Sequence, residues 1–366
     1  MTKKARPGDL VPVFAALCLF LAAFEYLIPK PLPFLRLGLA NLPLLLALPL
    51  LAPADFFLLA GIKTAGQALL SGTLLSYVTL FSLGGTAASS AVMFLLYRLF
   101  GRGPRPLLGF PGLGIAGALA SNGAQLALAR GLVFGPQARL LAPPFLAAGL
   151  VTGCALGLFC DAFSRRSGWI RDLGEKNALS PPLGGVGGGS ETNPDPSLPS
   201  PKGRRDAFSP PLTLFCAGLG LAAVFLVTPS LESRIMQFLL FWGTAVREGK
   251  RTRPLVMLGT ALAVILCNLA APYGELLFRA GPLAVTRGAL EAGVRKALNL
   301  EGLMMLSRVC VSRGLRFPGR AGAVLAASLA LLERLSGQAL SAGRAALKKK
   351  GLFAGLDAAL FSLWNG

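Results

Sequence analysis

Polar side chains recur at helical spacing inside the apolar first half of the chain. Lys63, Gln67 and Ser71 are four residues apart, which places them on one face of a helix, and Asn122 and Gln125 are three apart. A cation and several amides on neighbouring helices can bind a small polar or anionic molecule through charge and hydrogen bonds. These residues are therefore the first candidates for a binding site.

Two further stretches add to this set. Glu25 lies in an apolar run near the N-terminus, and Arg36 and Asn41 open the next run. Ionisable and amide groups are costly in apolar surroundings, so they normally face a cavity or a partner. We expect one ligand pocket built from Glu25, Arg36, Asn41, Lys63, Gln67, Asn122 and Gln125. The alternative is that Glu25 pairs with Lys63 or Arg36 and that the amides only tie helices together.

The stretches that carry these residues have the composition of membrane helices. Of the 366 residues, 54% are hydrophobic and 14% are charged, against roughly a quarter charged in soluble proteins. About 20 apolar residues cross a bilayer, and the first half offers six candidates at 10–28, 37–52, 54–75, 76–98, 107–129 and 140–163.

Two of these candidates need comment. The 37–52 segment is short and contains Pro43 and Pro49, so it could be broken or partly re-entrant. Residues 1–28 have no small-residue cleavage site, so we interpret them as an uncleaved first span and not as a signal peptide.

Basic clusters indicate the orientation of these segments. They occur at 3–6, before the first segment, at 98–105, after the fourth, and at 165–171, after the sixth. Cytoplasmic loops retain Lys and Arg, so the sequence predicts a multi-pass protein of the cell (inner, cytoplasmic) membrane with a cytoplasmic N-terminus. The net charge of +20 is thereby explained by the lipid bilayer, and no nucleic acid is expected as a partner.

The second half is separated from the first by a change in composition. Residues 164–209 are rich in Gly, Pro, Ser and charge, which predicts a disordered cytoplasmic linker. Apolar segments follow at 211–229, 235–246 and 254–271, then a helix-compatible stretch at 283–311 and an amphipathic stretch at 321–347 expected on the cytoplasmic side. The expected fold is all-α and polytopic, with a six-helix solute-binding module (1–163), the linker, and a second helical membrane module with cytoplasmic amphipathic helices (210–366).

Several kinds of chemistry are absent from the sequence. There is no His, and the six Cys lie in apolar runs without a C-x-x-C pair, so neither a metal site nor a redox dithiol is expected. No G-x-x-x-x-G-K-[ST] occurs, and none of the 16 acidic residues is adjacent to another, so the chain has neither a P-loop nor an Asp-rich Mg²⁺ site. We expect no cofactor and no enzyme activity of its own.

Several spaced motifs in the first module carry a family resemblance. They are EYLIPKPLP at 25–33, LGLAN at 37–41, SLGG at 82–85 with Ser89 and Met93, Gly117-Ala, and NGAQ at 122–125. Residues 10–163 resemble the Gx transporter family, also catalogued as heptaprenyl diphosphate synthase component I. Its members are similar to the substrate-binding subunits of energy-coupling-factor transporters, six-helix membrane proteins that capture a vitamin-like solute.

The resemblance is carried residue by residue, and two departures from it bear on the ligand. Lys63 stands where the family usually has Arg, which keeps the charge but loses the planar fork that grips a carboxylate or phosphate. Ser121 stands where the family usually has His before Asn122. The matching positions are Glu25, Pro29, Gly38, Leu39, Asn41, Thr64, Gly72, Gly84, Gly85, Asn122 and Gln125.

The second module has a weaker resemblance. Residues 281–290 (GPLAVTRGAL) resemble a segment of the energy-coupling-factor transmembrane (T) subunits, whose cytoplasmic helices dock on ATPases through short Arg-centred motifs. The resemblance implies a coupling role for Arg313 and Arg344 and cytoplasmic ATPase subunits as partners in trans. The two arginines could equally be positive-inside anchors.

The sequence thus favours one function and leaves others open. The first is a transporter component that captures a small vitamin- or precursor-like solute and is energised by separate ATPases. The alternative is a non-catalytic membrane subunit that assists a separate heptaprenyl diphosphate synthase in isoprenoid or quinone biosynthesis. A purely structural scaffold would leave the intramembrane polar residues unexplained.

Overall fold

The six segments predicted in the first half are helical. The computed structural model describes residues 10–27, 38–101, 107–170, 210–250, 254–280, 283–311, 315 and 317–335. The predicted 37–52 segment is short, because a 3-10 helix, η2 (Leu39–Asn41), leads directly into a helix of only six residues. The helices of the first module are α1 (Leu10–Leu27), α2 (Leu42–Ala47), α3 (Pro53–Ser71), α4 (Tyr77–Phe100), α5 (Phe110–Ala129) and α6 (Ala138–Arg166).

The helix α3 has clear stop and start signals in its sequence. Pro53 occupies its first turn, where the missing N–H is not needed. At its other end Gly72 adopts φ 65°, and its N–H caps the carbonyls of Ala68 and Leu69. A left-handed residue at this position favours glycine, and it turns the chain sharply into α4. The helix that carries Lys63 and Gln67 therefore has well-defined ends.

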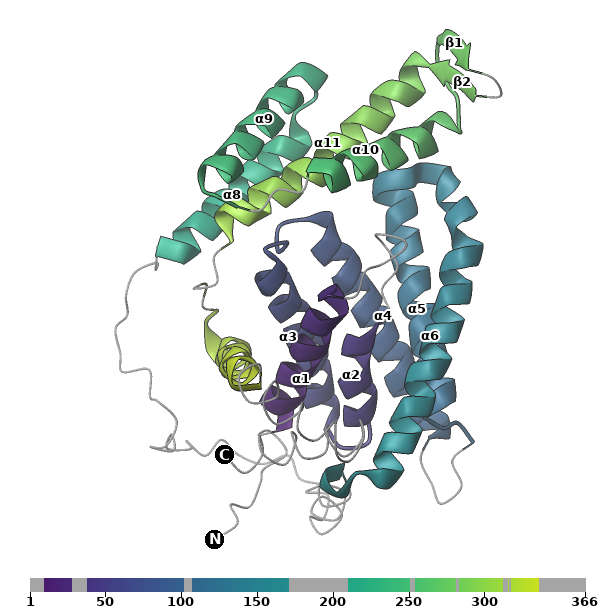
Figure 1. Cartoon of the computed structure of the whole chain (residues 1–366), viewed down its shortest axis with the longest axis vertical. Coiled ribbons are helices and arrows are strands. Elements are labelled where there is room, and N and C mark those ends of the chain that lie inside the picture. Colours follow the sequence, from purple (N-terminus) through teal and green to yellow (C-terminus); the bar gives the residue numbers. More distant parts are fainter. Residues whose placement is uncertain are drawn as a thin grey trace.

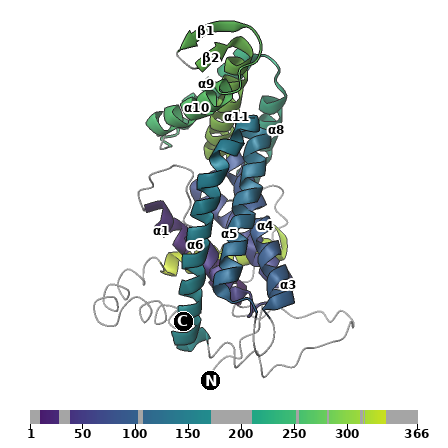
Figure 2. The same cartoon turned by 90° about the vertical axis from the view of Figure 1, so that its right-hand side faces the viewer.

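Two long helical stretches have the length and composition to cross a membrane. Within the described part of the chain they are Tyr77–Phe100 and Phe110–Arg166, and the apolar helices Leu10–Ala23, Leu212–Val227 and Pro254–Leu269 are shorter. The second stretch contains α5, a π-helical turn η3 (Arg130–Phe134), a 3-10 turn η4 (Gly135–Gln137) and α6. Both stretches indicate a membrane protein, and α4, α5 and α6 run side by side along the long axis of the molecule (Figure 2).

Small residues hold α4, α5 and α6 together. A Cβ added to Gly114 of α5 would lie 2.5 Å from the carbonyl oxygen of Gly153 in α6, and one added to Gly157 would strike the Cα of Pro111. A Cβ on Gly85 of α4 would likewise collide with the Gln125 side chain of α5. Such close approach of backbones is typical of membrane helix packing. We call these three helices the α4–α6 group.

The helices α1, α2 and α3, with η2, form a second unit, which we call the α1–α3 group. Its apolar core includes Phe14 and Phe56, both fully buried. Phe56 stacks on Phe94 of α4 at 6.0 Å between ring centroids, which joins the two groups. Trp169, 1% exposed, packs on Phe14. Ordered packing thus extends beyond residue 164, where the linker is predicted to begin; residues 171–209 lie outside the described part.

The described part of the second module contains long helices and one feature that the all-α prediction missed. Residues 276–280 and 283–286 form an antiparallel pair of strands in which Phe278 pairs with Val285 and Arg279 with Ala284. The hairpin follows Gly274, at φ 86°, and is only four to five residues per strand, too short to give a strand pattern in the sequence. The labelled elements of the second module are α8 (Pro210–Val227), α9 (Leu231–Arg247), α10 (Pro254–Leu269), β1 (Leu276–Ala280), β2 (Leu283–Thr286) and α11 (Arg287–Cys310).

This module lies across one end of the first module (Figures 1 and 2). The helices α10 and α11 pack on the π-helical turn, where Val133, Val264 and Ala297 form a small apolar cluster. The far ends of α4 and α6 carry Arg98 and Arg165. Arg98 and Arg165 mark the end of the first module that is predicted to be cytoplasmic. The helix α11 packs at the opposite end, which is predicted to face outward. The orientation of the chain in the membrane stays a prediction. A helix over 319–335 follows, and its Leu325 joins the core of the α1–α3 group.

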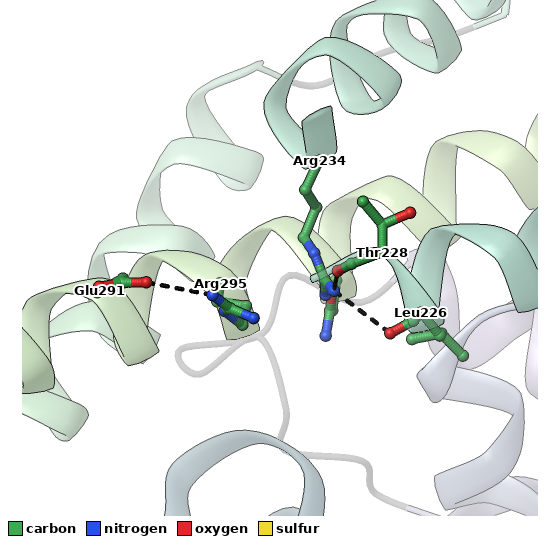
Figure 3. Close-up of polar contacts among 6 residues, drawn as sticks. Leu226, Thr228, Arg234, Glu291 and Arg295 are labelled. Atoms are coloured by element: carbon green, nitrogen blue, oxygen red, sulfur yellow. Dashed lines mark hydrogen bonds and ion pairs between the residues drawn. The ribbon is translucent and has the colours of Figure 1, made fainter. Parts of the chain in front are cut away.

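A buried arginine joins three helices of the second module (Figure 3). Arg234 of α9 is 3% exposed and donates to the backbone carbonyls of Leu226 and Thr228 at the end of α8, the former at 3.3 Å. It also donates to the Asn299 side chain of α11, and its guanidinium lies 5.7 Å from the centre of the Phe225 ring. A cation is favourable at a helix C-terminus. Arg234 therefore links α8, α9 and α11.

Candidate functional site

A polar cavity lies between the two helix groups of the first module. Its volume of about 80 Å³ is room for several water molecules or part of a small solute. Six of the seven predicted binding residues line it, and Arg36 lies outside the described residues. The lining side chains that can hydrogen-bond are Glu25, Asn41, Lys63, Gln67, Ser82, Thr86, Ser121, Asn122, Gln125 and Thr152.

The α1–α3 group supplies the charged wall of this cavity. Lys63, midway along α3 and 4% exposed, donates a hydrogen bond from its ammonium group to the amide oxygen of Asn41. Glu25, near the end of α1 and 6% exposed, accepts a hydrogen bond of 3.1 Å from the backbone N–H of Leu39. Asn41 and Leu39 both belong to η2, and the pairing of Glu25 with Lys63 or Arg36 stays a prediction. The short turn η2 thus brings an amide and a backbone group against the two buried charges.

The α4–α6 group supplies an uncharged polar wall. Asn122 donates from Nδ2 to the backbone oxygen of Phe145 at 2.7 Å, and Gln125 donates from Nε2 to the Ser121 hydroxyl at 3.1 Å. The first bond joins α5 to α6, as the helix-tying alternative expects, yet both amides also face the cavity. A molecule bound here would meet one cation, one carboxylate and several amides and hydroxyls.

Small and apolar residues complete the lining of the cavity, among them Ala40, Ala118, Phe145 and Leu156. A pocket that combines apolar residues with a few convergent polar groups is the arrangement of a ligand site. Among the described lining residues, Lys63 and Glu25 carry charges of opposite sign.

Four lining hydroxyl residues were missed as site residues in the sequence analysis. Ser82 and Thr86 are four apart on α4, and Thr152 lies on α6 opposite Asn122 and Gln125. The four-residue spacing of Ser82 and Thr86 was a usable signal, but their positions in a run of small residues suggested packing. Ser121 was noted only as a departure from the family pattern.

A second, smaller cavity adjoins the first one. It has a volume of about 10 Å³ and shares Gln67 and Ser82 with the larger cavity. Its hydroxyl groups bond to one another, with 2.7 Å between the side-chain oxygens of Ser71 and Thr73. The predicted face of Lys63, Gln67 and Ser71 therefore borders two adjoining cavities, the second of which has room for about one water molecule.

The remaining predictions concern residues without a described position. Arg313 and Arg344, the expected coupling residues, lie outside the described part of the chain, as Arg36 does. Among the described residues, no three His, Cys, Asp or Glu side chains come together as a group that could hold a metal ion. The structure thus leaves the coupling role of the arginines as a prediction.

Comparisons with known proteins match the two halves of the chain to two different family models. Residues 14–163 match the family "Heptaprenyl diphosphate synthase component I", and residues 212–312 match a "Domain of unknown function (DUF8519)". No curated protein and no solved structure matches the chain. The first match covers every described residue that lines the pocket, and the second covers most of α8 and all of α9, α10 and α11.

Proposed function

We propose, from the match of residues 14–163 to the heptaprenyl diphosphate synthase component I family, that the chain is a non-catalytic membrane subunit of a heptaprenyl diphosphate synthase. The family match is the observation that carries the proposal. Prenyl transfer uses Mg²⁺ held by acidic side chains, and the sequence has no adjacent pair of acidic residues. A separate soluble prenyltransferase would therefore perform the chemistry, and this chain would hold it at the membrane.

A second candidate function is favoured by the pocket. A subunit that only anchors a partner needs no polar cavity inside its helices, where buried ionisable groups are costly. Lys63 and Glu25 offer both signs of charge, which fits a neutral or zwitterionic solute better than a bare diphosphate. Capture and uptake of such a solute, energised by separate ATPases, is the function that this observation supports.

The two functions share one element, a small polar ligand in the Lys63 pocket. In the first it would regulate or supply the synthase, and in the second it would be the transported solute. The two differ in the soluble partner: a prenyltransferase in one case, ATPases in the other.

The experiment that separates them is recovery of partners from native membranes. The full chain, tagged and expressed at its natural level, is purified in mild detergent beside an unrelated multi-pass protein with the same tag. Specific enrichment of a prenyltransferase, together with prenyl-transfer activity in the eluate, supports the first function. Specific enrichment of ATPases with ATP-hydrolysis activity supports the second, and enrichment of neither class contradicts both.

A further inference from the structure

The helix that carries Lys63 is held at both ends by the second module. At the C-terminal end of α3, the backbone N–H of Leu75 donates to the hydroxyl of Ser307 in α11 at 3.0 Å. Gly72, which ends α3, lies against the adjacent Arg308. Ser307 is fully buried, so this contact excludes water. The turn between α3 and α4 is therefore packed directly on α11.

At the other end of α3 there is an ion pair between the modules. Arg320, at the start of the helix over 319–335, lies 2.8 Å from the carboxylate of Asp55, in the first turn of α3. Asp55 is 13% exposed, whereas Arg320 is 68% exposed. Val311, Leu315 and Leu325 of the second module belong to the apolar core cluster that contains Phe14 and Phe56. Both polar and apolar contacts thus fix the charged wall of the pocket to the second module.

The opposite wall of the pocket is held by the same module. Asn268 of α10 is 8% exposed and donates from Nδ2 to the backbone oxygen of Val133 at 3.3 Å. The ammonium group of Lys296 in α11 donates to the side-chain amide oxygen of Asn268 at 2.9 Å. Val133 lies in the π-helical turn that joins α5 to α6, the helices of the uncharged wall. Turns of this kind inside long helices are often functional.

These contacts make α11 and the helix over 319–335 a bridge across the seam that contains the pocket. Lys296 and Ser307 are 11 residues apart, which in a helix is about 16 Å, and this length separates the two turns that α11 contacts. We propose that the second module sets the separation of the two pocket walls, with Asn268 and Arg320 as positioning residues. A movement of α11 relative to either helix group then changes the access of a ligand to Lys63.

The second module would thus control the pocket, and only the biological use of this control rests on the proposed function. The test measures how accessible a cysteine in the pocket is to a reagent, with no ligand added. Its outcome is therefore independent of the functional proposal. The reporter is a cysteine in place of Ser82, which lines both cavities. The matched control is a cysteine at the next residue of α4, Leu83, which is 50% exposed on the outside of the helix.

The full-length chain in detergent is treated with a small water-soluble methanethiosulfonate, and the labelling rate at each reporter is followed by peptide mass spectrometry, which separates it from the six native cysteines. Arg320→Asp should increase the rate at residue 82 about threefold to fivefold, because an exposed ion pair contributes little free energy. Asn268→Ala should increase it about fivefold or more, because it removes buried hydrogen bonds. The rate at residue 83 should not change.

The charge-swapped variant, Asp55→Arg with Arg320→Asp, is the decisive control for the ion pair. It should return the rate at residue 82 to the wild-type value. An unchanged rate at residue 82 in both Arg320→Asp and Asn268→Ala would overturn the proposal. Equal increases at residues 82 and 83 would also overturn it, since they indicate general loosening, and an increase that the swap does not reverse would remove Arg320 from the mechanism.

Discussion

The ammonium group of Lys63 in α3 donates a hydrogen bond to the amide oxygen of Asn41 in η2. This contact brings a buried cation to the edge of a polar cavity. Asn41 is the last residue of the short 3-10 turn, which leads directly into α2. The turn thus places an amide group against the buried cation.

Close packing of α5 on α6 leads to a prediction about stability. Gly114→Ala should lower the melting temperature of the detergent-solubilised chain by roughly 2–10 °C, because the added Cβ meets a backbone carbonyl that cannot turn aside. The control is Gly123→Ala on the same helix, where nothing lies within 4 Å of the added Cβ. Equal melting temperatures for the two variants would show that the close approach at Gly114 is not required.

The sequence predicted the helices of the first module well, because apolar length is the main signal of a membrane helix. It also predicted residues that line one cavity, since Lys63 and Gln67 share a helical face and Glu25 and Asn41 lie at segment ends; their role in binding stays a prediction. The hairpin at 276–286 could not be predicted, because short strands resemble a helix end in composition. The contacts of Ser307 and Asn268 with the first module depend on tertiary packing. The pattern of apolar residues does not determine which turns α11 contacts.

A buried carboxyl group in α11 makes stability depend on pH. Burial raises the pKa of Glu301 above its ordinary value, and a hydrogen bond from Thr260 and the charge of Arg308 oppose this shift in part. Its second oxygen has no hydrogen-bond partner among the described atoms. A raised pKa in the folded state means that stability is fully present below the ordinary glutamate pKa and is lost as the pH rises through the raised value.

We therefore expect the melting temperature to fall from acidic to neutral pH in the wild-type chain, and to fall less in Glu301→Gln, which keeps an acceptor for Thr260. The measurement is a melting curve at a series of pH values. Glu291→Gln, an exposed residue paired with Arg295, is the control and should follow the wild type. If Glu301→Gln leaves the pH dependence of the melting temperature unchanged, that dependence arises from other groups and the prediction is wrong.

Arg234 gives a prediction for the architecture of the second module. Arg234→Ala should destabilise that module by about 2–5 kcal/mol, because it leaves the carbonyls of Leu226 and Thr228 and the amide of Asn299 without their donor. Limited proteolysis within 210–311 as a function of temperature measures the effect. Arg295→Ala removes only a partly exposed pair with Glu291 and should change the cleavage little. Similar cleavage of the two variants would show that Arg234 does not join the helices.

The central claim is that a small polar ligand binds between the two helix groups at Lys63. Its most direct test is native mass spectrometry of the full chain purified from its own membranes, beside the double variant Lys63→Ala with Asn122→Ala. We predict a bound small molecule on the wild-type chain and its loss from the double variant, with equal amounts of both proteins in the membrane. A wild-type chain without any bound molecule, or one bound equally to both proteins, would contradict the claim and return these side chains to a packing role.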